Sequence, residues 1–395
     1  MTSVLPPQRR TRPANRRELI IVAAKELFAA RGYEYVNMSE IAEAVAVRPS
    51  ALYRHFSSKE QLLQEILRLG LTSLASAVSA LDLAAGPDGL LELAGLLVDN
   101  RNTAGLLGRE VPHLSEGPRA SVRLELVTVA RLLAAKIASE RPQLQPHASD
   151  FLSWAALAVL QSPAYQHAEL PRADHASEVA RLTWQVIFSP LPDQFTGSQL
   201  PRNVAGLLPF SRREALLAQA VDLFAARTYA SVSIEDVAAT LGIAGPSVYN
   251  HFPSKSAILV TALSRGSAWL SMQVADTLAK SENSESALAT IIRSYAGFAA
   301  AHPALTDLMI SEVRSLPEPD REVTLTAQRD YVAQLVQLLR QAHPALSLAR
   351  ANVQVQAALM IANDVARSPH LRDQIASTQA VTALCGQILG LPQTP

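Results

Sequence analysis

Two short groups of polar side chains recur along this chain with the same internal spacing. The first group holds Tyr53, Arg54, His55 and Lys59, and the second holds Tyr249, Asn250, His251 and Lys255. Arginine suits a bidentate contact with guanine and asparagine suits one with adenine, so helices that carry these residues can recognise DNA. The competing interpretation is that each Tyr-x-His-Phe string only packs in a core, where Phe56 and Phe252 are expected in either case.

Residue patterns for other kinds of chemistry are absent from the sequence. There is no His-Glu-x-x-His, no phosphate loop ending in Gly-Lys-Ser/Thr and no Gly-x-Ser-x-Gly. The nine histidines are scattered, and the single cysteine, Cys385, excludes an intrachain disulfide and a cysteine-rich zinc site. We therefore expect no catalytic residues, no metal and no cofactor, and we expect that the chain is not an enzyme.

The two polar groups belong to a long internal repeat. Residues 16–67 align with residues 212–263 without a gap, at a constant offset of 196. Positions that differ usually keep their apolar character. A fainter match, at an offset of 202, joins 109–119 to 311–321, so the duplicated unit is about half of the chain.

Capping signals predict where the first two helices of each copy begin. The boxes are Asn15-x-x-Glu18 and Ser211-x-x-Glu214, followed by Asn37-x-x-Glu40 and Ser233-x-x-Asp236. Gly32 should end the first helix of the first copy, whereas Thr228 stands there in the second copy.

The next turn and helix complete a recognisable module in each copy. Gly242 suits a turn with positive φ, and Ala46 occupies that position in the first copy at some cost in stability. A third helix is predicted over 49–56 and over 245–252. Two short helices joined by a tight turn and braced by a preceding helix form a helix-turn-helix module.

Composition favours an all-α protein of two or three domains. Of the 395 residues, 49% are hydrophobic, only 5% are aromatic and 18% are charged, with a formal net charge of zero. The zero total is mildly unusual for a DNA-binding protein, although the distribution of charge matters more than the sum. No signal-peptide core and no run of about 18 apolar residues is present, so we expect a cytoplasmic protein without a membrane partner.

The ordered motifs resemble the tetracycline-repressor family. In the first copy they are Phe28, Gly32-Tyr33, Ile41-Ala42, Ala46-Val47, Leu52-Tyr53-Arg54-His55-Phe56 and Ser58-Lys59. In the second copy they are Phe224, Thr228-Tyr229, Val237-Ala238, Gly242-Ile243, Val248-Tyr249-Asn250-His251-Phe252 and Ser254-Lys255. Two such modules in one chain are similar to the double-domain regulators of actinobacteria, which include repressors of lipid-uptake operons.

This resemblance implies two tandem units that form an intramolecular pseudodimer. The expected domains are a basic arm at 1–13, a first helix-turn-helix domain at 14–60, a first helical effector and pairing domain at 61–192, a linker at 193–209, a second helix-turn-helix domain at 210–256 and a second helical domain at 257–392. The linker would extend to about 55–60 Å at ~3.4 Å per residue, more than the roughly 34 Å of one turn of the DNA major groove.

The resemblance also assigns roles to residues at the DNA. Base contacts are expected from Arg48, Pro49, Ser50, Ala51 and Arg54, and from Ala244, Gly245, Ser247 and Asn250. Phosphate contacts, which orient a protein without specifying sequence, are expected from Tyr53, His55, Lys59, Tyr249, His251 and Lys255. The arm arginines and Arg16-Arg17 could follow the DNA backbone, although the arm composition also favours disorder.

The two expected recognition helices carry different side chains, with Arg54 against Asn250 and Arg48 against Ala244. A homodimer reads a palindrome because its halves are identical, and a fused pair of unlike halves need not do so. We therefore predict an asymmetric operator.

A small hydrophobic effector, derived from a lipid, an acyl-CoA or a steroid, is expected by resemblance to release the DNA. Arg109, Glu110 and Glu312 are its candidate contacts, and ordinary surface salt bridges are the alternative. The pairing helices are predicted at 148–167 and 177–188, against 348–368 and 378–389. One chain would then act as a pseudodimer, or two chains would associate.

Two alternatives to repression remain open from the sequence. The chain could be a transcriptional activator, or a protein-interaction scaffold whose DNA-binding modules have degenerated. Ala46, Arg48 and Ala244 depart from the usual family residues and support the second alternative.

Overall fold

The computed structural model describes residues 16–165, 170–200 and 209–392. The predicted all-α class is confirmed, because these ranges form helices and one isolated bridge between Gln199 and Gln374. None of the helices in these ranges is long and apolar enough to cross a membrane. The expected basic arm at 1–13 and part of the expected linker, 201–208, lie outside the described residues.

The first unit begins with a three-helix head, which we call the first head. Its helices are α1 (Arg16–Arg31), α2 (Met38–Ala44) and α3 (Pro49–Leu52). The body of this unit contains α4 (Lys59–Ala80), η1 (Leu83–Leu90), α5 (Leu91–Asp99), α6 (Arg101–Glu110), η2 (Val111–His113), α7 (Glu116–Glu140), α8 (Pro146–Gln161), η3 (Ser162–Tyr165) and α9 (Arg172–Phe188).

The second unit repeats this order. Its head, the second head, contains α10 (Arg212–Arg227), α11 (Ile234–Thr240) and α12 (Gly245–Val248). Its body contains α13 (Lys255–Lys280), α14 (Ser284–Ala301), α15 (Pro303–Ser311), η4 (Val313–Ser315), α16 (Glu318–Ala342), α17 (Leu348–Arg367), α18 (Pro369–Arg372) and α19 (Ser377–Ile388).

The predicted caps of the second helix in each head form completely. In the first head Asn37 Oδ1 accepts from the Glu40 backbone N–H and Glu40 accepts from the Asn37 N–H. Ser233 and Asp236 form the same reciprocal pair, although Asp is shorter than Glu. The predicted box at Ser211 is wrong, because Ser211 makes no side-chain cap. Glu214 instead pairs with Arg265, 51 residues away.

Three further helix boundaries differ from the sequence prediction. The third helix of each head has only four α-helical residues, and a turn continues it to Phe56 and Phe252. The helix predicted over 148–167 ends at Gln161, where the 3-10 helix η3 follows. Helix α4 runs unbroken across the expected domain boundary at 60/61.

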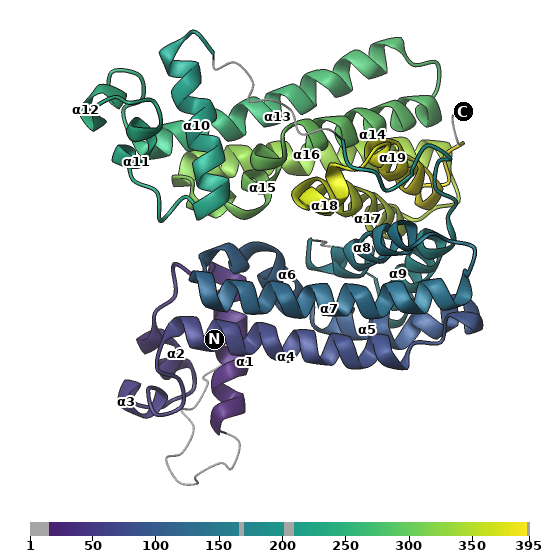
Figure 1. Ribbon diagram of the computed structural model, residues 1–395, viewed down its shortest axis with the longest axis horizontal. Helices are drawn as coiled ribbons and strands as arrows, with labels where there is room; N and C mark the ends of the chain where they lie inside the picture. Colours follow the sequence, from purple (N-terminus) through teal and green to yellow (C-terminus); the bar gives the residue numbers. More distant parts are fainter. Residues whose placement is uncertain (1–15, 166–169, 201–208, 393–395) are drawn as a thin grey trace, which may run out of the picture.

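The two units are stacked body against body, and both heads lie on the same side of the molecule (Figure 1). Helix α8 packs along α17, and α9 contacts α17 and α19, which are the helices expected to pair. Within this interface Gln354 donates to Glu178 Oε1 at 2.8 Å in a buried position. One continuous apolar core runs from the first head through both bodies, whereas the second head has its own core.

Part of the expected linker is packed and hydrogen-bonded. Phe195 is buried against Phe151, with ring centroids 4.7 Å apart. The Leu200 N–H donates to Asp373 O, and the Ile375 N–H donates to Ser198 O at 2.8 Å. The segment up to residue 200 therefore ties the first body to the second.

Candidate DNA interface and effector site

The polar residues of each recognition turn point outward while their apolar neighbours are buried. Leu52, Phe56, Val248 and Phe252 are buried. The structure separates the exposed residues from the half-buried ones as follows. Exposed are Arg48, Pro49, Ser50, Tyr53, Arg54, His55, Ala244, Tyr249 and Asn250; half-buried are Ala51, Gly245, Ser247 and His251. Core packing accounts for the phenylalanines and leaves both tyrosines and Arg54 free for a ligand.

A left-handed turn sets the position of each recognition turn. Ala46 has φ +52° and Gly242 has φ +63°, so the first head keeps the geometry that glycine favours. The following residue then closes onto the preceding helix, with Val47 N–H donating to Ala42 O and Ile243 N–H donating to Ala238 O. The same backbone geometry therefore presents different side chains in the two heads.

Lys59 and Lys255 are bound to the loop that follows the first helix of each head. Lys59 Nζ donates to Tyr33 O at 2.9 Å, and Lys255 Nζ donates to Tyr229 O at 2.8 Å. Each ammonium also lies 4.2 Å from the ring centroid of that tyrosine. Burial lowers the pKa of both lysines. These lysines brace the loop between the first two helices of each head, and phosphate contact from them stays a prediction.

Glu110 and Glu312 fasten the heads to the bodies. Glu312 is 2% exposed and accepts from the Tyr229 backbone N–H at 3.0 Å. Glu110 is buried and accepts from the Tyr33 backbone. Burial raises the pKa of Glu110, against the opposing effects of His113, Arg109 and Arg314. Both carboxylates thus have a structural role at the loops of the heads, and effector contact from them stays a prediction.

One fastening crosses between the units. Arg314, in η4 of the second unit, donates from Nη2 to Ala29 O in the last turn of α1 at 3.0 Å. Tyr35 Oη donates to Arg314 O at 3.3 Å. The residue of the first unit that aligns with Arg314, at the offset of 202, is Pro112, which has no N–H and no charge. A guanidinium at a helix C-terminus is favourable, so Arg314 of the second body caps α1 of the first head. Pro112 of the first body cannot make the same contact with the second head.

Arg109, the third expected effector contact, lies at the junction of the units. Its guanidinium carbon is 5.4 Å from the ring centroid of Tyr165. Arg367, from the second unit, lies nearby and donates to Gly108 O at 2.9 Å. Arg109 does not line the main cavity of the first unit.

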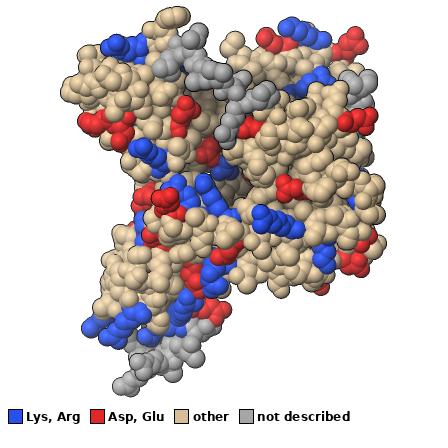
Figure 2. Space-filling view, viewed as in Figure 1, with Lys and Arg blue, Asp and Glu red and all other residues tan. Residues whose placement is uncertain are grey.

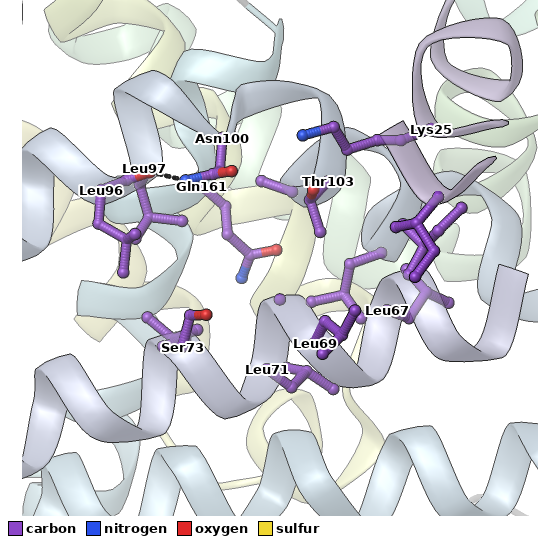
Figure 3. A pocket seen from close by; sticks show the side chains of 16 residues that line it. Lys25, Leu67, Leu69, Leu71, Ser73, Leu96, Leu97, Asn100, Thr103 and Gln161 are labelled. Atoms are coloured by element: carbon purple, nitrogen blue, oxygen red, sulfur yellow. Dashed lines mark hydrogen bonds between the residues drawn. The ribbon is translucent and has the colours of Figure 1, made fainter. Parts of the chain in front are cut away.

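That cavity has a volume of about 160 Å³ and lies between α1, α4, α5 and α6 (Figure 3). Its wall is mainly apolar, with Ile66, Leu67, Leu71, Leu74, Leu97 and Leu107 among the lining residues. Lys25, Ser73, Asn100, Thr103 and Gln161 add polar groups. No motif in the sequence predicts this site, although Lys25 and Thr103 differ in character from Val221 and Leu305 at the matching positions.

Comparisons with known proteins agree with the duplicated architecture. The family described as "Bacterial regulatory proteins, tetR family" matches residues 20–66 and again 216–262. The family described as "Tetracyclin repressor-like, C-terminal domain" matches residues 281–367. Both heads and the second body therefore match domains of one family of regulatory proteins. The chain belongs to the TetR family of bacterial regulatory proteins.

Individual relatives match parts of the chain. The transcriptional repressor KstR2 of Rhodococcus jostii is 35% identical over 124 residues, which cover 30% of this chain and 60% of that protein. The regulator TcmR of Streptomyces glaucescens is 50% identical over 46 residues, which cover 12% of this chain and 20% of that protein. The chain thus spans between a fifth and three fifths of the length of the curated relatives it matches.

Among solved structures, KstR2 of Mycobacterium tuberculosis is 22% identical with a TM-score of 0.42, and the match covers 48% of this chain and 97% of that chain.

Proposed function

We propose that this chain is a transcriptional repressor that binds an asymmetric operator, with one head on each of two unlike half-sites. The supporting observation is that the two exposed recognition turns differ in chemistry while their backbones match. Arg48 and Arg54 stand where the second head has Ala244 and Asn250. Guanidinium groups favour guanine and the asparagine amide favours adenine, so the two heads prefer different bases.

The charge distribution supports unequal roles for the heads. No acidic or basic residue lies between Ala244 and His251. Lys and Arg side chains gather at the outer end of the first head, whereas on the second head the same view shows scattered basic and acidic side chains (Figure 2). Because phosphate neutralisation supplies the salt-dependent part of DNA affinity, we infer that the first head contributes most of that dependence.

A single chain is sufficient for this proposal. The buried contacts of α8 and α9 with α17 and α19 hold the two bodies together as a dimer interface would. Covalent linkage raises the effective concentration of one unit at the other, so pairing does not depend on protein concentration. We propose that a monomer is the functional species, and a homodimer is the alternative.

Release of DNA by a small hydrophobic effector completes the proposal. The apolar cavity of the first unit supports it, because helix α1 of the head forms part of the cavity wall. A transcriptional activator is the second candidate. FasR of Mycolicibacterium smegmatis, described as an activator, is 41% identical over 63 residues, which cover 16% of this chain and 29% of that protein. A reporter gene placed behind the selected operator distinguishes the two by the sign of the response.

Selection of binding sites from random duplexes, followed by footprinting, tests the asymmetric operator. We expect two unlike half-sites. Arg54→Ala should relax base preference in one half-site and Asn250→Ala in the other, each by about 1–3 kcal/mol of discrimination. A palindromic consensus, with equal losses in both halves from either substitution, would contradict the proposal.

A further inference from the structure

The cavity of the first unit combines an apolar interior with a cation at its rim. Lys25 extends from α1 toward Asn100 and Thr103 (Figure 3). Within the described residues Lys25 has no ion-pair partner, and its neighbours one turn away on α1 are Ile21, Val22, Phe28 and Ala29. The lysine is half-buried. An ammonium without a counter-ion at the rim of an apolar cavity favours an anionic ligand group.

Further polar groups lie beside this lysine. The Gln161 side chain points into the cavity between α4 and α5 (Figure 3) and forms no hydrogen bond within the described residues. Asn100 Nδ2 donates to Leu96 O at 2.9 Å, which leaves its Oδ1 available as an acceptor. The polar groups therefore include several hydrogen-bonding sites around one positive charge, above a wall of leucines.

The corresponding region of the second unit carries larger and less polar side chains. Trp269 and Phe298 replace Ser73 and Leu96, and their rings stack with centroids 4.7 Å apart. Leu305 and Met309 replace Thr103 and Leu107. These side chains lie against Gly266 as Thr103 lies against Gly70, so the two units differ here in the size and polarity of the covering side chains. Val221 stands where the first unit has Lys25, so the cation is lost as well.

We propose that the first unit binds one medium-chain carboxylic acid per chain, with the carboxylate at Lys25 and the hydrocarbon tail among the leucines of α4, α5 and α6. An apolar cavity of about 150 Å³ holds a benzene-sized molecule. A cavity of about 160 Å³ therefore suits a tail of roughly six to eight carbons. The site itself is independent of DNA binding, and only its regulatory role rests on the proposed function.

The ligand would contact the first head directly. Ile21 and Lys25 belong to α1, and the other lining residues, including Gln161 of α8, belong to the body of the first unit. Helix α6 also ends at Glu110, which holds the Tyr33 loop of the same head. Binding therefore changes the contact between α1 and the first body, while the contacts of the second head with its own body are untouched.

Calorimetric titration of the full chain with sodium octanoate, and with octanamide as its neutral analogue, tests the site. The expected result is one octanoate per chain, bound at least about tenfold more tightly than octanamide. Lys25→Val, which installs the residue of the second unit, should remove this preference for the acid. Lys280→Val, at an exposed lysine on α13, should leave it unchanged.

A double substitution tests the location of the hydrocarbon tail. Thr103→Leu with Leu107→Met installs the residue types that fill the second unit, and it should abolish binding of both compounds while circular dichroism shows the helical fold retained. Two octanoates per chain, no octanoate binding, or unchanged binding in this folded double variant would overturn the inference. Octanoate binding in a chain that fails to select any DNA sequence would uphold the site and refute the proposed function.

Discussion

Ala46 occupies a left-handed turn where the second head has glycine. Its φ is +52°, and its backbone N–H still donates to Glu43 O at 2.9 Å. A left-handed conformation costs an L-residue roughly 1–2 kcal/mol, so the turn that positions Arg48 and Arg54 is under local strain. A Cβ at Gly242 would meet no atom within 4 Å. A substitution there therefore tests the cost of the left-handed backbone alone, without a steric clash.

Exchanging these two residues should move the stability of the two heads in opposite directions. Ala46→Gly is expected to stabilise the first head by roughly 0.5–1 kcal/mol, and Gly242→Ala to destabilise the second by a similar amount. Native-state hydrogen exchange of the α2 and α11 amides measures each head separately. Ala23→Gly, in the middle of α1, is the control and should destabilise the first head. Destabilisation of the first head by Ala46→Gly would contradict the strain argument.

At the scale of elements, the sequence was sufficient where the interactions are local. The capping boxes at Asn37 and Ser233 involve partners three residues apart, and both were predicted. The box at Ser211 fails because Arg265, on another helix, engages Glu214. The bond from Lys59 to Tyr33 O could not be predicted, because it depends on a loop that only the folded head brings near the lysine. The cavity could not be predicted either, because it depends on how four helices pack.

The cap that Arg314 places on α1 should control the orientation of the first head alone. Arg314→Met removes a charge-assisted hydrogen bond, a type worth about 1.5–3 kcal/mol. We expect faster hydrogen exchange in the last turn of α1 and weaker binding of the first half-site, with α10 unchanged. Arg314→Lys keeps the charge and should restore part of the protection.

Arg321→Met is the matched control for this prediction, because Arg321 pairs with Glu318 on its own helix and does not contact α1. It should leave exchange in α1 unchanged. Equal effects of Arg314→Met on α1 and α10 would contradict a one-sided cap.

At the scale of the whole molecule, fusion has made two similar units unequal in three places. The recognition turns differ at Arg54 and Asn250, and the cross-unit cap has Arg314 on one side and Pro112 on the other. The residues that line the cavity of the first unit are replaced by larger side chains in the second. A symmetric homodimer cannot carry such differences, because each residue occurs at both equivalent positions. The repeat in the sequence predicted the two units, whereas their inequality at the cavity and at the cap required the packed structure.

The mass of the protein–DNA complex tests the central claim most directly. Native mass spectrometry of the full chain with its selected duplex should give one chain per duplex, and replacing either half-site by a copy of the other should weaken binding. Two chains per duplex on a palindromic site, with no loss after the replacement, would contradict the account.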